Sequence, residues 1–118
     1  MSLSNAHHFQ QKDLFGGTGT VDIWNLKAQS APPFTAVLWC ELEPNGRVGH
    51  HRQSDYPEIL IGISGQGLVE VNRKALKDAF TEGSFVYLPL GAVLAIENPH
   101  SEPLKYLIIK AQQSKPKV

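Results

Sequence analysis

The sequence has almost no cysteine and no long apolar segment. Cys40 is the only cysteine, so an intrachain disulfide and a thiolate metal cluster are both excluded. A lone thiol fits a reducing compartment, and we expect a cytoplasmic protein. The longest apolar run, residues 86–96, is interrupted by Pro89 and Gly91 and is too short to span a bilayer. We therefore expect no membrane partner.

The sequence also lacks an excess of charge of either sign. Its 11 Lys and Arg residues balance 11 Asp and Glu residues, and the sequence pI is about 7.0. A surface that follows nucleic-acid phosphates needs clustered positive charge. We therefore expect no nucleic-acid partner. The first residues, MSLSNAHHFQQKD, contain no apolar segment of the kind found in secretory signals, which agrees with a cytoplasmic location.

Short apolar runs alternate with turn-forming residues along the chain, which is typical of an all-β protein. The pattern predicts strands at residues 20–27, 34–42, 48–53, 58–64, 67–72, 84–88, 92–97 and 104–110. Eight short strands in one chain of 118 residues favour a single domain that is a sandwich or a closed barrel. We assign residues 1–118 to this domain, with residues 1–15 as an N-terminal arm and residues 112–118 as a C-terminal tail.

Two segments have a less regular pattern. Residues 73–80, RKALKDAF, fit either one helical turn or a hairpin loop. Residues 15–20, FGGTGT, are rich in glycine but lack the Gly-Lys-Ser/Thr that reaches phosphates in a phosphate-binding loop. We therefore expect residues 15–20 to be a flexible lead-in to the first strand.

An acidic residue begins the most apolar strand. Glu58 stands at the head of the run EILIGIS. Because side chains alternate along a strand, Glu58 and Leu60 share one face, while Ile59, Ile61 and Ile63 share the other. Taken alone, a glutamate at the start of a strand is more often at the solvent-exposed mouth, and spacing alone favours that position.

A Glu58 side chain that points into a barrel needs a partner, because an isolated carboxylate in an apolar interior is strongly disfavoured. The sequence offers three kinds of partner: a metal ion, a protonated histidine, or the guanidinium group of Arg47 or Arg52.

Two adjacent histidines precede this strand. His50 and His51 point to opposite sides of a strand unless Gly49 supplies a bulge. His51 shares a face with Gln53, so an imidazole, an amide and the carboxylate of Glu58 can converge across the turn SDYP. For His50, a surface position beside a turn is the simpler interpretation.

At these residues the chain resembles the cupin family of small β-barrels. The first motif of that family is G-x5-H-x-H-x(3,4)-E-x6-G, and its positions are occupied here by Gly46, His51, Gln53, Glu58 and Gly65. The spacing from Gln53 to Glu58 and from Glu58 to Gly65 matches the motif. The gap between Gly46 and His51 is one residue short.

The second cupin motif, G-x5-P-x-G-x2-H-x3-N, is matched by GSFVYLPLGAVLAIEN. Its positions are occupied by Gly83, Pro89, Gly91 and Asn98, with Leu94 in place of the histidine. The two motifs together span residues 46–98, and the resemblance implies a cupin-type double-stranded β-helix, that is, a jelly-roll barrel. It implies no particular reaction, because this fold is used by enzymes, sugar-binding modules and storage proteins.

The resemblance also implies a metal site, but two of its four ligand positions are occupied by other residue types in this chain. A complete cupin site has three histidines and one glutamate around iron, manganese, nickel or zinc. Carried over by position, His51 and Glu58 are kept, Gln53 supplies an amide, and Leu94 cannot coordinate a metal. A neutral amide binds borderline metals more weakly than imidazole does. The implied cofactor is therefore a divalent Fe, Mn, Ni or Zn ion held weakly by His51, Gln53 and Glu58, or no metal.

Two functions remain open from the sequence. The first is a barrel with a degenerate, weak or absent metal centre that binds a small, partly apolar molecule. The residues predicted to line this pocket are His51, Gln53, Glu58, Leu60, Leu94 and Ile96. The second is a divalent-metal-dependent enzyme, of isomerase, lyase or dioxygenase type, with His51, Gln53 and Glu58 as ligands. We favour the first, because Leu94 gives the pocket an apolar wall where the family has an imidazole.

The sequence also predicts a homodimer. Ile59, Ile61 and Ile63 would form an exposed apolar stripe on an isolated barrel, and such a stripe needs a cover. The cover is either the N-terminal segment or a second subunit, and small cupins commonly form dimers. His50 and His100 receive no functional role.

Overall fold

The computed structural model describes residues 3, 6–27 and 29–113. The elements are β1 (His7–Lys12), the 3-10 helix η1 (Leu14–Gly16), β2 (Thr20–Asn25), β3 (Phe34–Leu42), β4 (Arg47–Arg52), β5 (Glu58–Ser64), β6 (Leu68–Val71), β7 (Lys74–Ala75), β8 (Phe85–Leu88), β9 (Val93–Glu97) and β10 (Leu104–Ala111). The expected all-β class is confirmed, and each of the eight predicted strands is present with small shifts at its ends.

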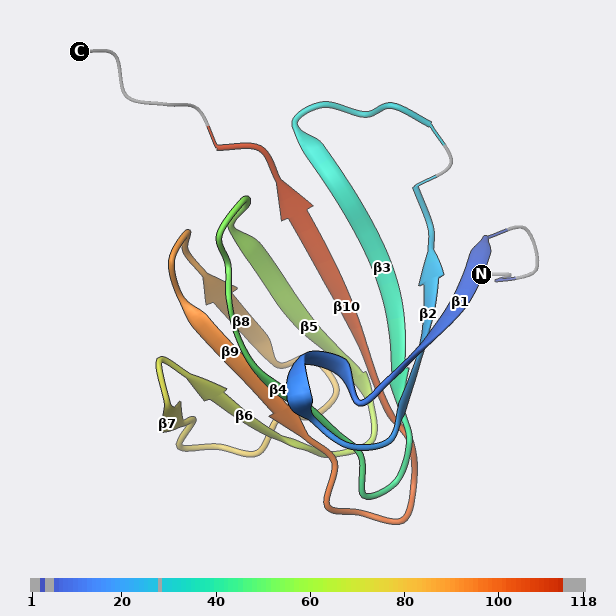
Figure 1. Ribbon diagram of the computed structural model, residues 1–118, viewed down its shortest axis with the longest axis vertical. Coiled ribbons are helices and arrows are strands. Elements are labelled where there is room, and N and C mark those ends of the chain that lie inside the picture. Colours follow the sequence, from blue (N-terminus) through green and yellow to red (C-terminus); the bar gives the residue numbers. More distant parts are fainter. Residues whose placement is uncertain (1–2, 4–5, 28, 114–118) are drawn as a thin grey trace.

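Two antiparallel sheets form a jelly-roll barrel (Figure 1). The larger sheet has the strand order β1-β2-β3-β10-β5-β8, and the smaller has the order β4-β9-β6-β7. The large sheet curves along one side of the barrel, and the small sheet faces it. Strands that are neighbours in a sheet are often distant in the sequence, as with β10, which lies between β3 and β5.

The space between the sheets is filled by the alternating inward side chains of both. On β5 and β10, for example, Leu60, Leu104 and Tyr106 are at most 2% exposed. The residues that alternate with them along each strand are only half-buried. This period-2 burial is what a strand with one face on a core requires. In the part of the chain that the structure describes, no helix is long and apolar enough to cross a membrane.

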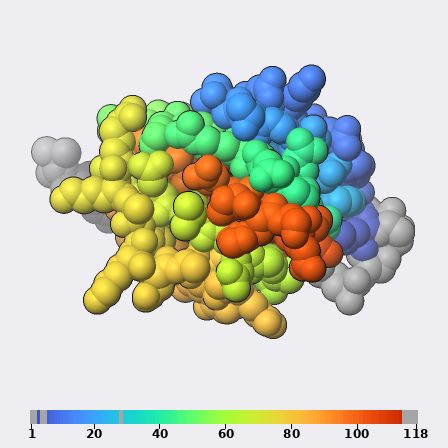
Figure 2. Space-filling view, turned by 90° about the horizontal axis from the view of Figure 1, so that it is seen from below, coloured from blue at the N-terminus to red at the C-terminus, as the bar shows by residue number. Residues whose placement is uncertain are grey.

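One end of the barrel is closed by turns that a buried asparagine ties together. The Nδ2 atom of Asn98 donates hydrogen bonds to the carbonyl oxygens of Leu42, Glu43 and Glu102, at 3.1, 3.2 and 2.8 Å. Seen from this end in Figure 2, the turns that contain residues 43–46, 64–67 and 98–103 lie against one another. His100 is exposed in one of these turns.

One expectation for local structure needs correction. Residues 7–12, assigned to the N-terminal arm and not predicted as a strand, form β1, which pairs with β2 from His7↔Asn25 to Lys12↔Thr20. β1 consists mainly of histidine and glutamine, so its sequence shows no alternation of apolar and polar residues that would predict a strand. Residues 114–118 of the expected tail lie outside the described residues.

The ambiguous segment after β6 is a hairpin and not a helical turn. β6 pairs with β7, and the connecting residues Asn72 and Arg73 both have positive φ, of 53° and 65°. Two consecutive residues with positive φ are the signature of a two-residue type I′ hairpin turn. Asn72 suits such a position better than most residues do.

The outer face of the large sheet is apolar over five strands. Trp24, Trp39, Leu107, Ile61 and Phe85 stand opposite one another in one cross-strand row. A second row contains Val37, Ile109, Ile59 and Tyr87. Phe85 and Tyr87 are 63% and 56% exposed. The predicted isoleucine stripe is thus part of a wider face, and β1 lies at the sheet edge without covering it.

We expect this outer face to pack against the same face of a second chain. Light scattering at micromolar concentration should give about twice the 13.0 kDa chain mass. Leu107→Lys, which places a charge in the centre of the first row, should raise the dimer dissociation constant at least ~30-fold. The control Ser101→Lys, in an exposed turn, should leave the dimer intact. A monomeric wild-type mass would contradict the prediction.

Candidate functional site

Glu58 is buried inside the barrel. It begins β5 on the inner face and is only 3% exposed, so the rim position that spacing alone favours is wrong. Burial raises the pKa of Glu58 from 4.5 to about 7, and the positive charge of Lys110 acts in the opposite direction. The carboxyl group therefore exchanges its proton near neutral pH. Its Oε2 atom has no hydrogen-bond partner among the described residues.

The charged neighbour of Glu58 is Lys110, which the sequence reading missed. β10 runs antiparallel to β5, and Lys110 stands directly opposite Glu58 in the register. The Nζ atom of Lys110 lies 3.8 Å from Oε1 of Glu58. The sequence did contain the information needed to predict this contact. Leu104, Tyr106 and Ile108 point inward, and alternation along the strand places Lys110 on the same face.

The two arginines proposed as partners of Glu58 lie elsewhere. Arg52 is exposed, and its Nη1 atom donates a hydrogen bond of 2.7 Å to the carbonyl oxygen of Gly91. Arg47 is exposed at the other end of β4, where it pairs with Glu97 in the strand register. Neither guanidinium group lines the cavity that contains Glu58.

The two histidines of β4 point to opposite sides, as expected for neighbours on a strand. His51 lines the barrel cavity, whereas the Nε2 atom of His50 lies 3.3 Å from Oε2 of Glu70 in the small sheet. The register of β4 against β9 shifts between Val48 and His51. His50 thus belongs to a half-buried contact outside the cavity.

His51 is held as a neutral ring with a defined tautomer. Its Nδ1 atom lies 3.0 Å from the carbonyl oxygen of Gly49, and because a carbonyl only accepts, Nδ1 carries the proton. Burial lowers the pKa of His51. The Nε2 atom is therefore the acceptor of the ring, available to a hydroxyl group or another donor.

Phe15 packs face to face on His51. The ring centroids are 3.9 Å apart and the planes differ by 13°. The surrounding backbone makes this approach possible, because a Cβ atom on Gly49 would lie 2.0 Å from the carbonyl oxygen of Phe15, and one on Gly17 would lie 1.8 Å from that of Arg47. The glycine-rich segment is therefore a 3-10 turn packed on β4, and the expected flexible lead-in is wrong.

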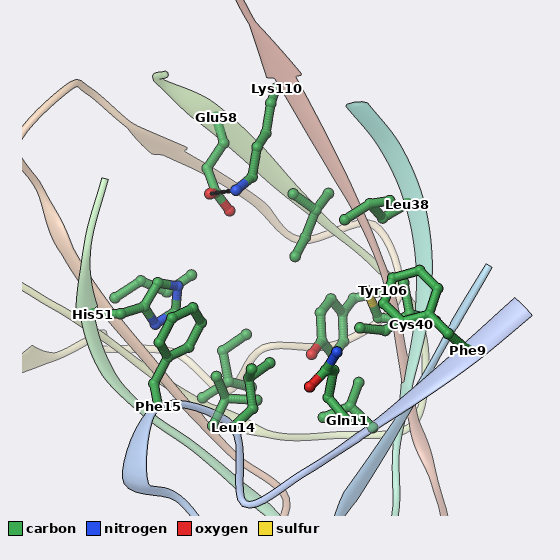
Figure 3. A pocket seen from close by; sticks show the side chains of 16 residues that line it. Phe9, Gln11, Leu14, Phe15, Leu38, Cys40, His51, Glu58, Tyr106 and Lys110 are labelled. Atoms are coloured by element: carbon green, nitrogen blue, oxygen red, sulfur yellow. Dashed lines mark ion pairs between the residues drawn. The ribbon is translucent and has the colours of Figure 1, made fainter. Parts of the chain in front are cut away.

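These residues surround a cavity of about 310 Å³ inside the barrel. Figure 3 shows Glu58 and Lys110 entering from one side, His51 with Phe15 from a second, and Gln11 near Tyr106 from a third. The remaining wall is mostly apolar. The N-terminal segment contributes four lining residues that the sequence reading missed, which are Phe9, Gln11, Leu14 and Phe15.

The predicted pocket residues separate into three groups. His51, Glu58, Leu94 and Ile96 line the cavity together. Gln53 is 4% exposed but lines a neighbouring cavity at the barrel mouth. Leu60 is completely buried and is absent from the lining of both cavities. His51 lines both cavities, so Gln53 shares the neighbouring cavity with His51 and is separated from Glu58, which lines only the first.

Two further polar side chains on the cavity wall do not ionise at physiological pH. Burial raises the pKa of the Cys40 thiol to about 12, with the charge of Glu58 adding to the shift. Burial also raises the pKa of Tyr106 well above its usual range. Both groups are neutral at physiological pH, and a thiol so far from ionisation is a poor nucleophile.

The residues present do not fit the metal centre that the fold family implies. Within residues 3, 6–27 and 29–113, no group of three or more His, Cys, Asp and Glu side chains is arranged to hold a metal ion. Gln53 opens into the other cavity, and the fourth position is the apolar, fully buried Leu94. An ammonium group already stands beside Glu58.

Comparison with known proteins gives a consistent family and fold. Residues 38–110 match a family model described as "Cupin domain". A search of curated proteins finds no match. A Thermotoga maritima protein described as a predicted oxalate decarboxylase is 22% identical, with a TM-score of 0.85 over 95% of this chain and 97% of that chain.

Two other solved structures share the fold at lower identity. A cupin-2 domain protein from Rhodospirillum rubrum has a TM-score of 0.80 at 17% identity, over 100% of this chain and 78% of that chain. The polyketide cyclase RemF from Streptomyces resistomycificus has a TM-score of 0.74 at 11% identity, over 98% and 80% of the two chains. At these identities the likeness concerns the fold alone.

The raised pKa of Glu58 predicts a pH-dependent stability. The folded protein keeps the proton up to about pH 7, whereas the unfolded chain releases it near 4.5. The stabilising contribution is therefore complete below pH 4.5 and is lost as the pH rises through 7. Between these limits, the free energy of unfolding of chelator-treated wild type should fall by about 3 kcal/mol relative to that of Glu58→Gln.

Urea unfolding across this pH range provides the measurement. His51, whose pKa is lowered, titrates in both proteins, so its contribution cancels in the difference. The control Glu97→Gln, on an exposed residue, should follow the wild-type curve. Parallel curves for wild type and Glu58→Gln would mean that the Glu58 carboxyl group is solvated in the folded protein.

Proposed function

This chain belongs to the cupin family, and we propose that it is a small-molecule-binding barrel whose ligand occupies the cavity beside Glu58. The family does not select the function, because one fold carries many chemistries. The two solved structures described as a predicted oxalate decarboxylase and a polyketide cyclase illustrate this, since they share the fold and are described with different activities.

One observation carries the proposal: a cavity of about 310 Å³ with a mostly apolar wall contains three convergent polar groups. His51 offers a lone pair at Nε2, Glu58 has an unpaired oxygen, and Lys110 offers an ammonium group. Small-molecule sites are typically apolar concavities of roughly 300–1,000 Å³ with a few placed polar groups. The volume is at the lower end of that range, which favours a small ligand.

The proposal includes a metal centre that is degenerate, weak or absent. Lys110 supplies a fixed positive charge beside Glu58, at 3.8 Å, where a bound cation would otherwise balance the carboxylate. Leu94 presents hydrocarbon where the family motif has an imidazole. The alternative, a divalent-metal-dependent enzyme that uses His51, Gln53 and Glu58, requires Gln53 to turn into the other cavity. The buried free thiol of Cys40 also fits the cytoplasmic location that the sequence favours.

The cavity should bind a neutral apolar probe. Titration of labelled protein with 2-phenylethanol should give saturable shifts of the backbone amides of Val21, Ile96 and Tyr106. Ile108→Trp fills the cavity from β10 and should weaken binding at least ~10-fold, since an added ring removes the space that the probe needs. The control Ile109→Trp adds the same ring on the outer face and should bind as wild type does.

Leu38→Phe, a smaller change on the neighbouring strand, covers the case in which Ile108→Trp does not fold. It should also weaken binding, because Leu38 stands opposite Ile108 and lines the same cavity. Absence of saturable binding to wild type, or equal binding to all variants, would overturn the proposed function.

The metal content should be low. Elemental analysis of protein purified without chelator or affinity metal should find far less than one Fe, Mn, Ni or Zn ion per chain. Titration with each of these ions should give no site that Glu58→Gln removes. Near-stoichiometric metal that disappears in Glu58→Gln would replace this proposal with the metal-dependent enzyme.

A further inference from the structure

A second cavity adjoins the first at the open end of the barrel. It has a volume of about 420 Å³ and is lined largely by the loop after β4, which includes Gln53 and Tyr56, and by Thr35 of β3. Phe15, His51 and Lys110 line both cavities. These three residues, which we call the neck, join an inner chamber of about 310 Å³ to this outer chamber.

Two residues that line the outer chamber each carry a buried polar atom without a hydrogen-bond partner in the described part of the chain. These atoms are Nε2 of Gln53 and Oγ1 of Thr35. The Gln53 backbone is fixed beside the chamber, because its N–H donates to the carbonyl oxygen of Ala92 and its own carbonyl oxygen accepts from the N–H of Gly91, both at 2.8 Å. A buried donor that remains unpaired costs roughly 1–3 kcal/mol, so such donors usually meet an acceptor.

The neck adds a positive charge to these donors. The Nζ atom of Lys110 is 3.8 Å from Glu58, beyond the usual hydrogen-bond length, so its three N–H groups remain available to another acceptor. The outer chamber also contains Asp55 and Arg52. Both are exposed, and Arg52 is engaged with Gly91. The buried groups of the chamber are thus hydrogen-bond donors around a single ammonium group.

We propose that the two chambers form one site for an amphipathic monocarboxylate. Its apolar group occupies the inner chamber, past the stacked rings of Phe15 and His51. Its carboxylate stays in the outer chamber, where it accepts hydrogen bonds from Lys110, Gln53 and Thr35. This assignment rests on the proposed function, because the inner chamber must accept the apolar group. It adds the class of ligand and gives Gln53 a role outside any metal centre.

The geometry also explains why the carboxylate stays outside. Lys110 lies between Glu58 on its inner side and the donors of the outer chamber. A second carboxylate in the inner chamber would face Glu58 across an apolar space, where like charges repel strongly. In the outer chamber the same group is separated from Glu58 by the ammonium group. The neck thus keeps the carboxylate of the ligand in the outer chamber and its apolar group in the inner chamber.

A matched pair of probes tests the assignment. Phenylacetate and 2-phenylethanol carry the same ring on a short chain, and only the first is a carboxylate. Isothermal titration of wild type should show phenylacetate binding at least ~10-fold tighter, as expected for hydrogen bonds to a charged group. Lys110→Met should remove this preference, so that the two probes bind with affinities within ~3-fold of each other, because the charged partner of the carboxylate is gone.

Two milder variants and one control complete the experiment. Gln53→Leu and Thr35→Val should each weaken phenylacetate binding about 3- to 10-fold without affecting 2-phenylethanol, because each removes one neutral donor to the carboxylate and leaves the ammonium group in place. Lys110→Arg, which keeps the charge, should keep most of the preference. The control Lys105→Met removes a lysine from the outer face of the same strand and should leave both affinities unchanged. These variants keep the test decisive if Lys110→Met does not fold.

The outcomes separate this inference from the proposed function. If wild type binds neither probe, the inner chamber is not a binding site and both fail. If wild type binds both probes equally, or binds the alcohol more tightly, only the carboxylate assignment is overturned. Unchanged phenylacetate affinity in Gln53→Leu and Thr35→Val would also overturn it, since the outer chamber would then hold solvent only.

Discussion

The burial of one carboxyl group beside one ammonium group is the constraint on which the site depends. The cross-strand register sets Lys110 opposite Glu58, so each charge enters the barrel only because the other does. Burial favours the neutral acid and the lysine favours the carboxylate, and the pKa of Glu58 rises to about 7 as the balance of the two. At 3.8 Å neither group uses up the hydrogen-bonding capacity of the other. The pair is therefore poised to interact with a third group.

The barrel confines this polarity to one end. At the closed end, Asn98 donates hydrogen bonds to three carbonyl oxygens and ties the turns together. The middle is hydrocarbon, with Leu94 and Ile96 almost completely buried. The ion pair lies near the mouth, where Glu58 begins its strand and Lys110 lies near the end of its own. A ligand that enters therefore meets this pair before it reaches the mostly apolar inner wall.

Alternation along strands was enough to predict the all-β class and to place Glu58 on one face with Leu60, because a period of two is a local property of the backbone. It did not predict that Glu58 is buried, since spacing alone favoured the rim, and the jelly-roll barrel was implied by the resemblance to the cupin motifs. The same rule applied one strand further would have found Lys110. Other features depend on contacts that no local pattern records. Phe15 reaches His51 only because Gly17 and Gly49 permit close backbone approach, and β1 is a polar edge strand whose sequence has no apolar period. Gln53 lines the outer chamber with His51, as their shared parity predicts, but Glu58 lines only the inner chamber.

In the proposed function, the charge beside Glu58 comes from Lys110 and not from a metal ion, and this difference changes what the barrel can do. An ammonium group is a compact charge with three donors, and it cannot lower the pKa of a bound water or offer open coordination positions as a metal ion does. It is also permanently attached, so its charge does not depend on the supply of an ion. A site built on Lys110 and Glu58 is consequently suited to recognising an oxygen acceptor and to holding or releasing a proton near neutral pH. The first of these capacities is the one that the proposed amphipathic acid would use, and the strand register brings the two groups together.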